Sequence, residues 1–138
     1  MRSGSVLVRR TPLARGTKPL ARTKAKRWAP SSAERRFDAW VRATVRERDG
    51  GLCRRCSGPG TDAAHVERLG AGASRYDRLD IRNYPALRVL LCRADHVAID
   101  ERREWAWSDI GLDLEALRVE AREEMWKNGE RFVGRASA

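Results

Sequence analysis

An incomplete pair of cysteine knuckles constrains this chain more than any other feature. Cys53 and Cys56 form one Cys-x2-Cys pair, and Cys92 is followed at the same spacing by Asp95 instead of a fourth cysteine. Two such pairs supply the four tetrahedral ligands of a structural zinc site. A fold that uses this framework has to bring two segments, far apart in the sequence, to one point.

The aspartate in the last position is compatible with a complete zinc site, because a carboxylate oxygen can take the place of a thiolate. Three thiolates and one carboxylate also carry the same formal charge as four thiolates. We therefore expect a structural Zn²⁺ held by Cys53, Cys56, Cys92 and Asp95. Two alternatives stay open at this point: His96 replaces Asp95 as the fourth ligand, or the three cysteines are free.

The only two histidines of the chain, His65 and His96, both lie within or directly beside this framework. On a helix, His96 and Asp100 share one face, which suits an imidazole and a carboxylate that hold one divalent ion. His65, on a predicted strand without an evident ligand partner, can act as a base on water. Hydrolysis of a phosphodiester with one metal ion requires this combination of groups. Each histidine taken alone would more often be structural.

Capping residues and hydrophobic spacing predict a helix of about 16 residues at the start of the ordered region. Ser31 and Glu34 form a capping box, apolar residues follow at helical spacing, and Asp49-Gly50-Gly51 ends the run. Residues 62–66 and 87–91 read as short strands, joined by a long loop rich in Gly, Arg and Asp.

The second half of the chain is predicted to be mainly helical. One helix should run from Cys92 to about Trp105, and a last helix from the N-cap Asp113 to Asn128-Gly129. Trp105 and Trp107 are expected to fill a core; base stacking is the alternative. With 138 residues the chain has room for one domain, which we place at residues 31–129, with 130–138 as a tail.

The positive charge is concentrated in the first part of the chain. Nine of the 29 Lys and Arg residues and none of the 19 acidic residues lie in positions 1–33, so the excess of +10 resides almost entirely there. Proline within a short Pro-Leu-Ala-Arg repeat argues against a helix. We expect a flexible basic arm over residues 1–30 that contacts DNA phosphates; a solubilising leader is the alternative. The candidate DNA contacts are Arg9, Arg10, Arg15, Lys18, Arg22, Lys24, Lys26 and Arg27.

Several short motifs together resemble the HNH endonuclease motif in its zinc-knuckle variant. They are Cys-x2-Cys, Ala-Ala-His65-Val, Arg-Asn83-Tyr and Leu-Leu-Cys92-x2-Asp95-His96-x3-Asp100. The basic, Pro-Leu-rich leader is similar to that of small phage HNH proteins and of the recombination-associated Rap/NinG type. The resemblance covers roughly residues 10–112.

The resemblance implies a small ββα-metal core with a zinc knuckle and flanking helices, which is an α+β fold. By the same resemblance, His65 is the general base of a metal-dependent DNA endonuclease or nickase, and Asn83 fixes the intervening loop and orients His65. His96 would bind the catalytic cation (Mg²⁺, Mn²⁺, Ni²⁺ or Zn²⁺) with Asp100. DNA and phage or host DNA-processing proteins are the implied partners. Without the resemblance, Asn83 reads as an ordinary turn residue.

The chain departs from the family pattern at Ala64, where many members place an Asp or His ligand directly before the base. Asp62 lies on the same face of the predicted strand as Ala64, but about 6.6 Å further along the strand. It could therefore serve as a metal ligand only if the strand were bulged or the ion shifted. Asp100 is the preferred carboxylate.

A second class of function is a non-catalytic zinc module that binds nucleic acid or protein, favoured by Ala64 and by the confinement of charge to the arm. Three cysteines, two of them in a tight knuckle, fit metal ligation in a reducing compartment better than disulfides. The early apolar run is too short for a signal peptide or a membrane span. We expect a soluble cytoplasmic protein, in the host cytoplasm if phage-encoded.

Overall fold

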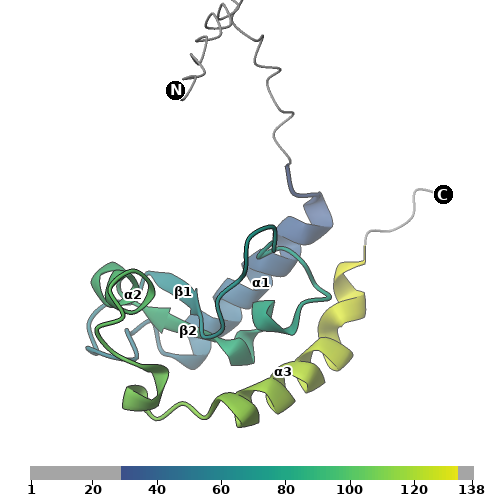
Figure 1. Cartoon of the computed structure of the whole chain (residues 1–138). Helices are drawn as coiled ribbons and strands as arrows, with labels where there is room; N and C mark the ends of the chain where they lie inside the picture. The colour runs from purple at the N-terminus through teal and green to yellow at the C-terminus, as the bar shows by residue number, and fades with distance from the viewer. Residues whose placement is uncertain (1–28, 134–138) are drawn as a thin grey trace, which may run out of the picture.

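The computed structural model describes residues 29–133 and has an α+β fold. Within this range lie three α-helices and two antiparallel strands, in the order α1 (Ser32–Arg48), β1 (Asp62–His65), β2 (Arg88–Leu91), α2 (Arg93–Asp100) and α3 (Leu114–Asn128). The turns that lead into β2 lie between α1 and α3, and α2 lies beside the strands (Figure 1). None of the helices in the described range is long and apolar enough to cross a membrane.

Helix α1 has the boundaries that its capping residues predict. The Ser31 backbone N–H donates to Glu34 Oε2 at 2.6 Å, and the Glu34 N–H donates to Ser31 Oγ at 3.2 Å, which completes the capping box. Gly50 and Gly51, with φ of +63° and +73°, turn the chain away after the last residue. Residues one or two turns apart form the buried face of the helix: Phe37, Val41 and Val45.

The larger core lies between α1, α3 and the segment that precedes β2. Phe37 and Tyr84 are fully buried and meet edge to face at 5.2 Å, and Ala121 of α3 closes the other side. The short turn Gly129–Phe132 follows α3, and the Phe132 ring lies 5.4 Å from that of Phe37. The packed region therefore extends beyond residue 129, into residues 130–138, which we expected to form a tail.

A second, smaller core lies under the cysteines. Helix α2 ends at Asp100, so the prediction of a helix to about Trp105 was wrong. Arg103 has a φ of +52°, a left-handed conformation that cannot continue a right-handed helix. The reversed chain brings Trp105 into this core, where it packs against Trp107 at 5.1 Å and donates from Nε1 to Asp95 O at 3.1 Å. The predicted core-filling role of the two tryptophans is confirmed.

The end of α1 is tied to β2 through Asp49. Its buried carboxylate accepts the Leu90 backbone N–H at 2.9 Å and both Nε and Nη2 of Arg48, at 2.8 and 3.0 Å. The Arg48 guanidinium in turn donates to the carbonyls of Pro85 and Arg88 at 2.8 and 2.6 Å. Burial alone would raise the pKa of Asp49, but the hydrogen bonds from Arg48 and Leu90 and the nearby arginine charges lower it on balance.

We predict that Asp49→Ala lowers the free energy of unfolding by about 3 kcal/mol, because it leaves the Leu90 N–H buried without an acceptor and removes the partner of Arg48. Asp49→Asn keeps an oxygen acceptor and should cost less. Since the folded state lowers the pKa of Asp49, the difference between wild type and Asp49→Ala should be complete above pH 3.8 and shrink as the pH falls further. Urea unfolding at several pH values measures the loss of stability and its pH dependence. Equal stability of wild type, Asp49→Ala and Asp49→Asn would refute the role of Asp49 in joining α1 to β2.

Candidate metal centre and histidine cleft

The first cysteine knuckle is bound directly to the strand that leads to the third cysteine. The Cys53 N–H donates to Gly58 O at 2.7 Å, and the Arg54 N–H donates to Leu90 O of β2 at 3.0 Å. A Cβ atom at Gly60 would lie 2.4 Å from Leu90 Cγ, so only glycine allows the knuckle to approach β2 this closely. The same strand ends at Leu91, so that Cys92 becomes the N-cap of α2.

The four predicted zinc ligands meet at one point. Atoms of Cys53, Cys56, Cys92 and Asp95 all lie within 4.8 Å of one another. The sulfurs of Cys56 and Cys92 are 3.8 Å apart, and Asp95 Oδ2 is 3.2 and 3.3 Å from the sulfurs of Cys53 and Cys92. Sulfur ligands at 2.3 Å from a tetrahedral zinc ion are about 3.8 Å apart, so the donor set fits a structural metal ion such as zinc.

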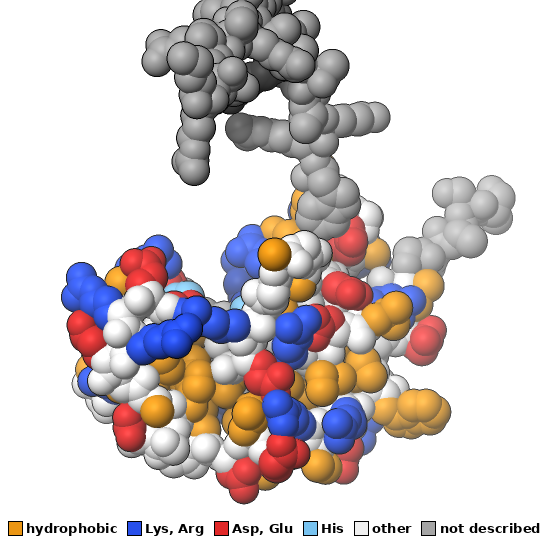
Figure 2. Space-filling view, in the orientation of Figure 1, with side chains coloured by type: hydrophobic (Ala, Val, Ile, Leu, Met, Phe, Trp, Pro, Cys, Tyr) orange, Lys and Arg blue, Asp and Glu red, His pale blue; other side chains and the backbone are white. Residues whose placement is uncertain are grey.

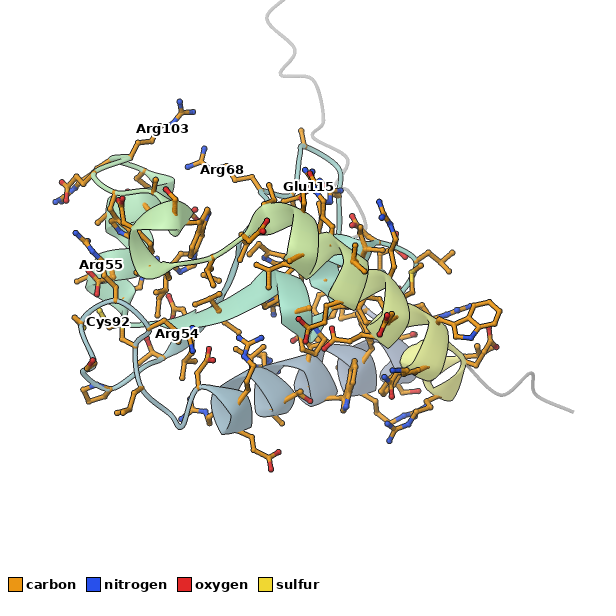
Figure 3. All side chains as sticks on the ribbon, turned by 90° about the horizontal axis from the view of Figure 1, so that it is seen from below. Arg54, Arg55, Arg68, Cys92, Arg103 and Glu115 are labelled. Carbon is orange, nitrogen blue, oxygen red and sulfur yellow. The ribbon has the colours of Figure 1, made fainter. Side chains whose placement is uncertain are left out.

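The electrostatics of the ligand set also favour a cation. The Gly58 N–H lowers the pKa of Cys56, but the Asp95 carboxylate and the other two thiols raise it to about 11 when no ion is bound. A cation at this point would favour the ionised Cys56 thiolate that zinc ligation requires. Arg55 donates to Asp95 Oδ1 at 3.1 Å and stacks 4.9 Å above Trp105, which gives the ligand set an outer positive partner. Figure 3 shows Arg54 and Arg55 beside Cys92 at this end of the molecule.

His65 is held by a buried asparagine. Asn83 is fully buried, and its Nδ2 donates to the carbonyls of Ser74 and Asp77 at 2.8 and 2.9 Å. These two bonds fix the amide, so Asn83 Oδ1 lies 2.9 Å from His65 Nε2 and accepts a hydrogen bond from its N–H. The hydrogen bonding thus assigns the tautomer with the lone pair on Nδ1, which has no hydrogen-bond partner among the described residues.

The surroundings of His65 keep its imidazole neutral. Burial, and then the positive charge of Arg88, lower the pKa of His65 to about 4, although the Asn83 hydrogen bond acts in the opposite direction. Arg88 is the cross-strand partner of His65 in the register of the sheet. A neutral ring with an open lone pair at physiological pH is the state that a general base requires.

His96 lies between two carboxylates. Its Nδ1 is 2.9 Å from Asp62 Oδ2 and its Nε2 is 3.0 Å from Asp100 Oδ2. Asp62 reaches the ring although the β1–β2 register is continuous from Asp62↔Leu91 to His65↔Arg88. Asp62 therefore reaches the His96 ring without a bulge, because α2 crosses close to the start of β1. Whether Asp62 binds a metal ion, which was expected to require a bulge or a shifted ion, stays a prediction. Arg93 also donates to Asp62 Oδ2 at 3.0 Å.

The two histidines face one cleft of about 410 Å³. It is lined by His65, Arg68, Leu69, His96 and Asp100. Asp62 is absent from this lining, so the Nε2 edge of His96, with Asp100, faces the cleft and the Nδ1 edge faces away. In the space-filling view, histidine surface is visible among Lys and Arg side chains (Figure 2).

His96 Nε2 and Asp100 Oδ2 form a pair of metal donors with a suitable spacing. Adjacent ligands of an octahedral ion with bonds of 2.0–2.1 Å are about 3.0 Å apart. In the described part of the chain, however, the cysteine cluster is the only group in which three or more His, Cys, Asp or Glu residues bring ligand atoms within 4.8 Å of one another. Ala64 is buried with 1% of its surface exposed and brings no donor to the cleft.

The sequence did not predict that two charged residues near the site, Arg88 and Asp38, are buried. Arg88 is 4% and Asp38 is 1% exposed, and their side chains face each other with Nη1 and Oδ1 3.9 Å apart. Arg88 also donates from Nε and Nη2 to Ala63 O of β1 at 3.0 and 2.7 Å. The available signal was an arginine inside an otherwise apolar strand. The predicted DNA contacts of the arm lie outside the described residues.

The metal centre predicts a specific pattern of metal content. Wild type and Asp95→Cys should each bind one zinc ion per chain, Asp95→Ala should bind it more weakly, and Cys56→Ser should lose it. Structural zinc binding is worth on the order of 10 kcal/mol, so chelation should lower the unfolding temperature sharply. Elemental analysis and thermal unfolding with and without EDTA test this; metal-free protein with an unchanged unfolding temperature would contradict it.

The environment of His65 predicts an unusual titration. In an NMR pH titration, its ring C–H resonances should shift with a midpoint near pH 4, against 6.5 for an exposed histidine. The unfolded chain takes up this proton first, so wild type should lose stability relative to His65→Gln as the pH falls from 6.5 towards 4. A midpoint at 6 or above would show that the ring is not buried and paired as described.

Comparisons with known proteins identify no relative of this chain. No protein-family model, no curated protein and no solved structure matches it. The functional interpretation therefore rests on the residues of the two neighbouring sites, which are the ligand cluster Cys53, Cys56, Cys92 and Asp95 and the cleft that His65 and His96 share.

Proposed function

We propose that this protein is a metal-dependent endonuclease of the HNH type that hydrolyses phosphodiester bonds in DNA. The observation that carries the proposal is the arrangement of His65. A neutral imidazole, fixed by a fully buried Asn83, lines the same cleft as the His96–Asp100 donor pair. A structural histidine does not need a ring nitrogen without a hydrogen-bond partner at a polar cleft, whereas a general base does.

In the proposed reaction, His65 acts on a water molecule in the cleft. Nδ1 takes a proton from the water while the water oxygen attacks the phosphorus atom and the P–O bond to the leaving oxygen breaks. Asn83 keeps Nε2–H engaged throughout, so the same ring nitrogen is always presented to the water. The imidazolium then returns its proton to the leaving oxygen or to solvent, which restores the neutral base.

His96 and Asp100 are the residues that would hold the catalytic divalent cation. A cation bound there stabilises the negative charge that develops on the phosphate and on the leaving oxygen. Asp62 accepts from His96 Nδ1, which directs the Nε2 lone pair into the cleft. We therefore propose that Asp62 orients His96 and that Asp100 binds the cation. Cys53, Cys56, Cys92 and Asp95 would hold a metal ion, proposed to be zinc, that would join the knuckle to β2 and α2.

The proposed substrate is DNA because the net charge of +10 is concentrated in the first 33 residues. A basic arm that precedes the described domain would attract the phosphate backbone without reading its sequence. Arg68, on the rim of the cleft with an exposed guanidinium 3.8 Å from Asp100, adds a cation close to the proposed reacting phosphate.

A second candidate is a metal-stabilised module that binds nucleic acid without cleaving it. The specific observation in its favour is the small number of donors around His96. Ala64 contributes none, and Asp62 and Asp100 lie on opposite edges of the ring. This alternative predicts salt-sensitive DNA binding without turnover and a single bound metal ion for each chain.

A plasmid assay tests the proposed function. Purified wild type with Mg²⁺, Mn²⁺ or Ni²⁺ should convert supercoiled plasmid to nicked or linear forms. His65→Ala should lower the rate by about 100-fold or more, because it removes the general base. His96→Ala should abolish the dependence on added cation, with little residual cleavage.

The matched control is Arg122→Ala, an exposed residue of α3 that lines none of the clefts around the histidines. Unchanged zinc content and unfolding temperature in His65→Ala would separate loss of the base from loss of the fold. Equal cleavage by wild type and His65→Ala would refute the role of His65. Absence of cleavage by wild type with all three cations would favour the binding module.

A further inference from the structure

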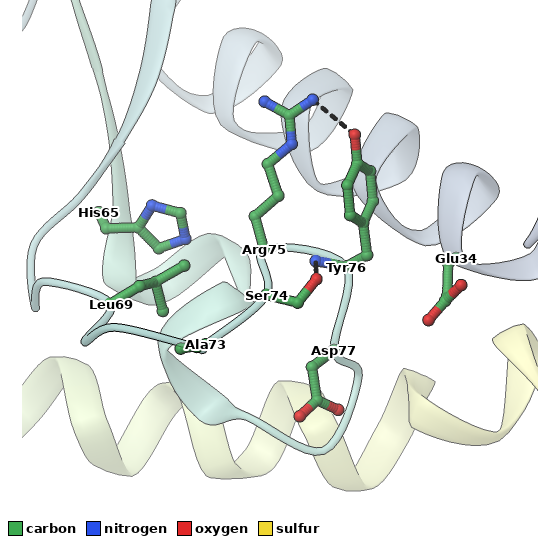
Figure 4. A pocket seen from close by; sticks show the side chains of 9 residues that line it. Glu34, His65, Leu69, Ala73, Ser74, Arg75, Tyr76 and Asp77 are labelled. Carbon is green, nitrogen blue, oxygen red and sulfur yellow. Dashed lines mark hydrogen bonds between the residues drawn. The ribbon is translucent and has the colours of Figure 1, made fainter. Parts of the chain in front are cut away.

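A second and larger cavity, of about 910 Å³, adjoins the histidine cleft. His65 and Leu69 line both cavities, so the two form one continuous groove with His65 at the junction. The larger cavity lies between the loop of residues 69–77 and Glu34 at the start of α1 (Figure 4). The proposed reaction at His65 needs only part of this space, because a volume near 900 Å³ is typical of sites for whole ligands.

Arg75 is the one arginine among the side chains that line this larger cavity. Its Nη2 donates to the Tyr76 hydroxyl at 2.7 Å, and its guanidinium lies 4.8 Å from the centre of the Tyr76 ring. About half of the side chain remains exposed. A guanidinium has five N–H donors, and the bond to Tyr76 is its only hydrogen bond within the described range, so Arg75 can bind a further acceptor.

Arg75 is also held from behind by a buried carboxylate. Its Nε lies 4.0 Å from Asp38 Oδ1, a buried oxygen that accepts no hydrogen bond among the described residues. Arg42 and Arg88 face the same carboxylate at 3.0 and 3.9 Å. Asp38 therefore attracts Arg75 into place without occupying its donors, and the other two arginines would keep Asp38 paired if Arg75 were removed.

The charge of the groove changes sign along its length. Arg75 is near the His65 end, whereas Glu34 and Asp77 bring carboxylates to the other end (Figure 4). Carboxylates repel phosphates but accept hydrogen bonds from the amino groups of bases, as Asp and Glu do from cytosine N4. A nucleotide matches this pattern, with its phosphate towards Arg75 and His65 and its base towards the acidic end.

We propose that this groove binds the nucleotide next to the phosphate that is cleaved, with Arg75 on its phosphate and Glu34 and Asp77 facing its base. The inference deepens the proposed function and rests on it for the position of the cleaved bond. Tyr76 and Asp38 act as positioning residues for Arg75. The ligand class is a single nucleic acid strand whose base carries an exocyclic amino group.

The phosphate end is tested by binding, without cleavage. Full-length wild type, Arg75→Ala, Arg75→Lys and the control Arg122→Ala are titrated with short fluorescent oligo-dC in the absence of added divalent cation, over a range of salt concentrations. Arg75→Ala should weaken binding about tenfold and reduce the slope of log K against log salt by about 0.7, the value for one single-strand phosphate contact. Arg75→Lys should keep most of the slope, and Arg122→Ala should change neither quantity by more than a small fraction of this.

The base end is tested by the ratio of affinities for oligo-dC and oligo-dT. Wild type should prefer oligo-dC, and Asp77→Asn should reduce this ratio severalfold because the amide replaces an acceptor-only group. Asn can keep the bond that Asp77 Oδ1 accepts from the Leu79 N–H at 2.9 Å, so the loop should retain its shape. No preference in wild type, or the same preference in Asp77→Asn, would overturn the base assignment.

The outcomes separate this inference from the proposed function. If Arg75→Ala binds oligonucleotides as Arg122→Ala does, or if wild type binds none, the groove is not a nucleotide site, whatever the plasmid assay gives. If Arg75→Ala is defective in binding but wild type cleaves no plasmid, the groove stands as a binding site and the nuclease proposal fails. Thermal unfolding of each variant excludes loss of the fold as the cause.

Discussion

Both sites depend on one buried hydrogen bond, which the Leu90 N–H donates to the Asp49 carboxylate. Asp49 ends α1, and the knuckle that holds Cys53 begins a few residues later. Leu90 is in β2, which pairs with the strand of His65 and leads directly to Cys92. One hydrogen bond thus connects the helix, the knuckle and the sheet, and its burial makes it costly to lose.

Helix α2 joins the metal centre to the histidine cleft. Asp95 and His96 are consecutive, and the rotation of about 100° per residue directs one towards the cysteines and the other towards Asp62 and Asp100. A metal ion bound by Cys92 and Asp95 would therefore also restrict the position of His96. Such an ion would help to maintain the geometry that the proposed site needs to within a fraction of an ångström.

Local signals in the sequence predicted much of the fold, and contacts between distant segments explain what they missed. The capping box at Ser31, the glycines after Asp49 and the cysteine spacing are local, and the structure contains all of them as expected. The predicted end of α2 was wrong because the left-handed Arg103 ends the helix. The contact between Asp62 and His96 was not foreseen because it depends on the packing of α2 across β1. The buried pair of Asp38 and Arg88 joins α1 to β2, and no periodicity in either segment reveals it.

The low pKa of His65 affects the two proton transfers of the proposed reaction in opposite directions. An imidazolium whose pKa is about 4 is a strong acid by the standards of histidine, so it gives its proton to bulk water rapidly. Recovery of the neutral base is then the more favourable of the two proton transfers. The cost falls on the forward transfer, since so weak a base gains little from capturing the proton of a water molecule. The attacking water would have to be acidified by its surroundings, which transfers the burden of rate enhancement from the histidine to the cation-binding side of the cleft.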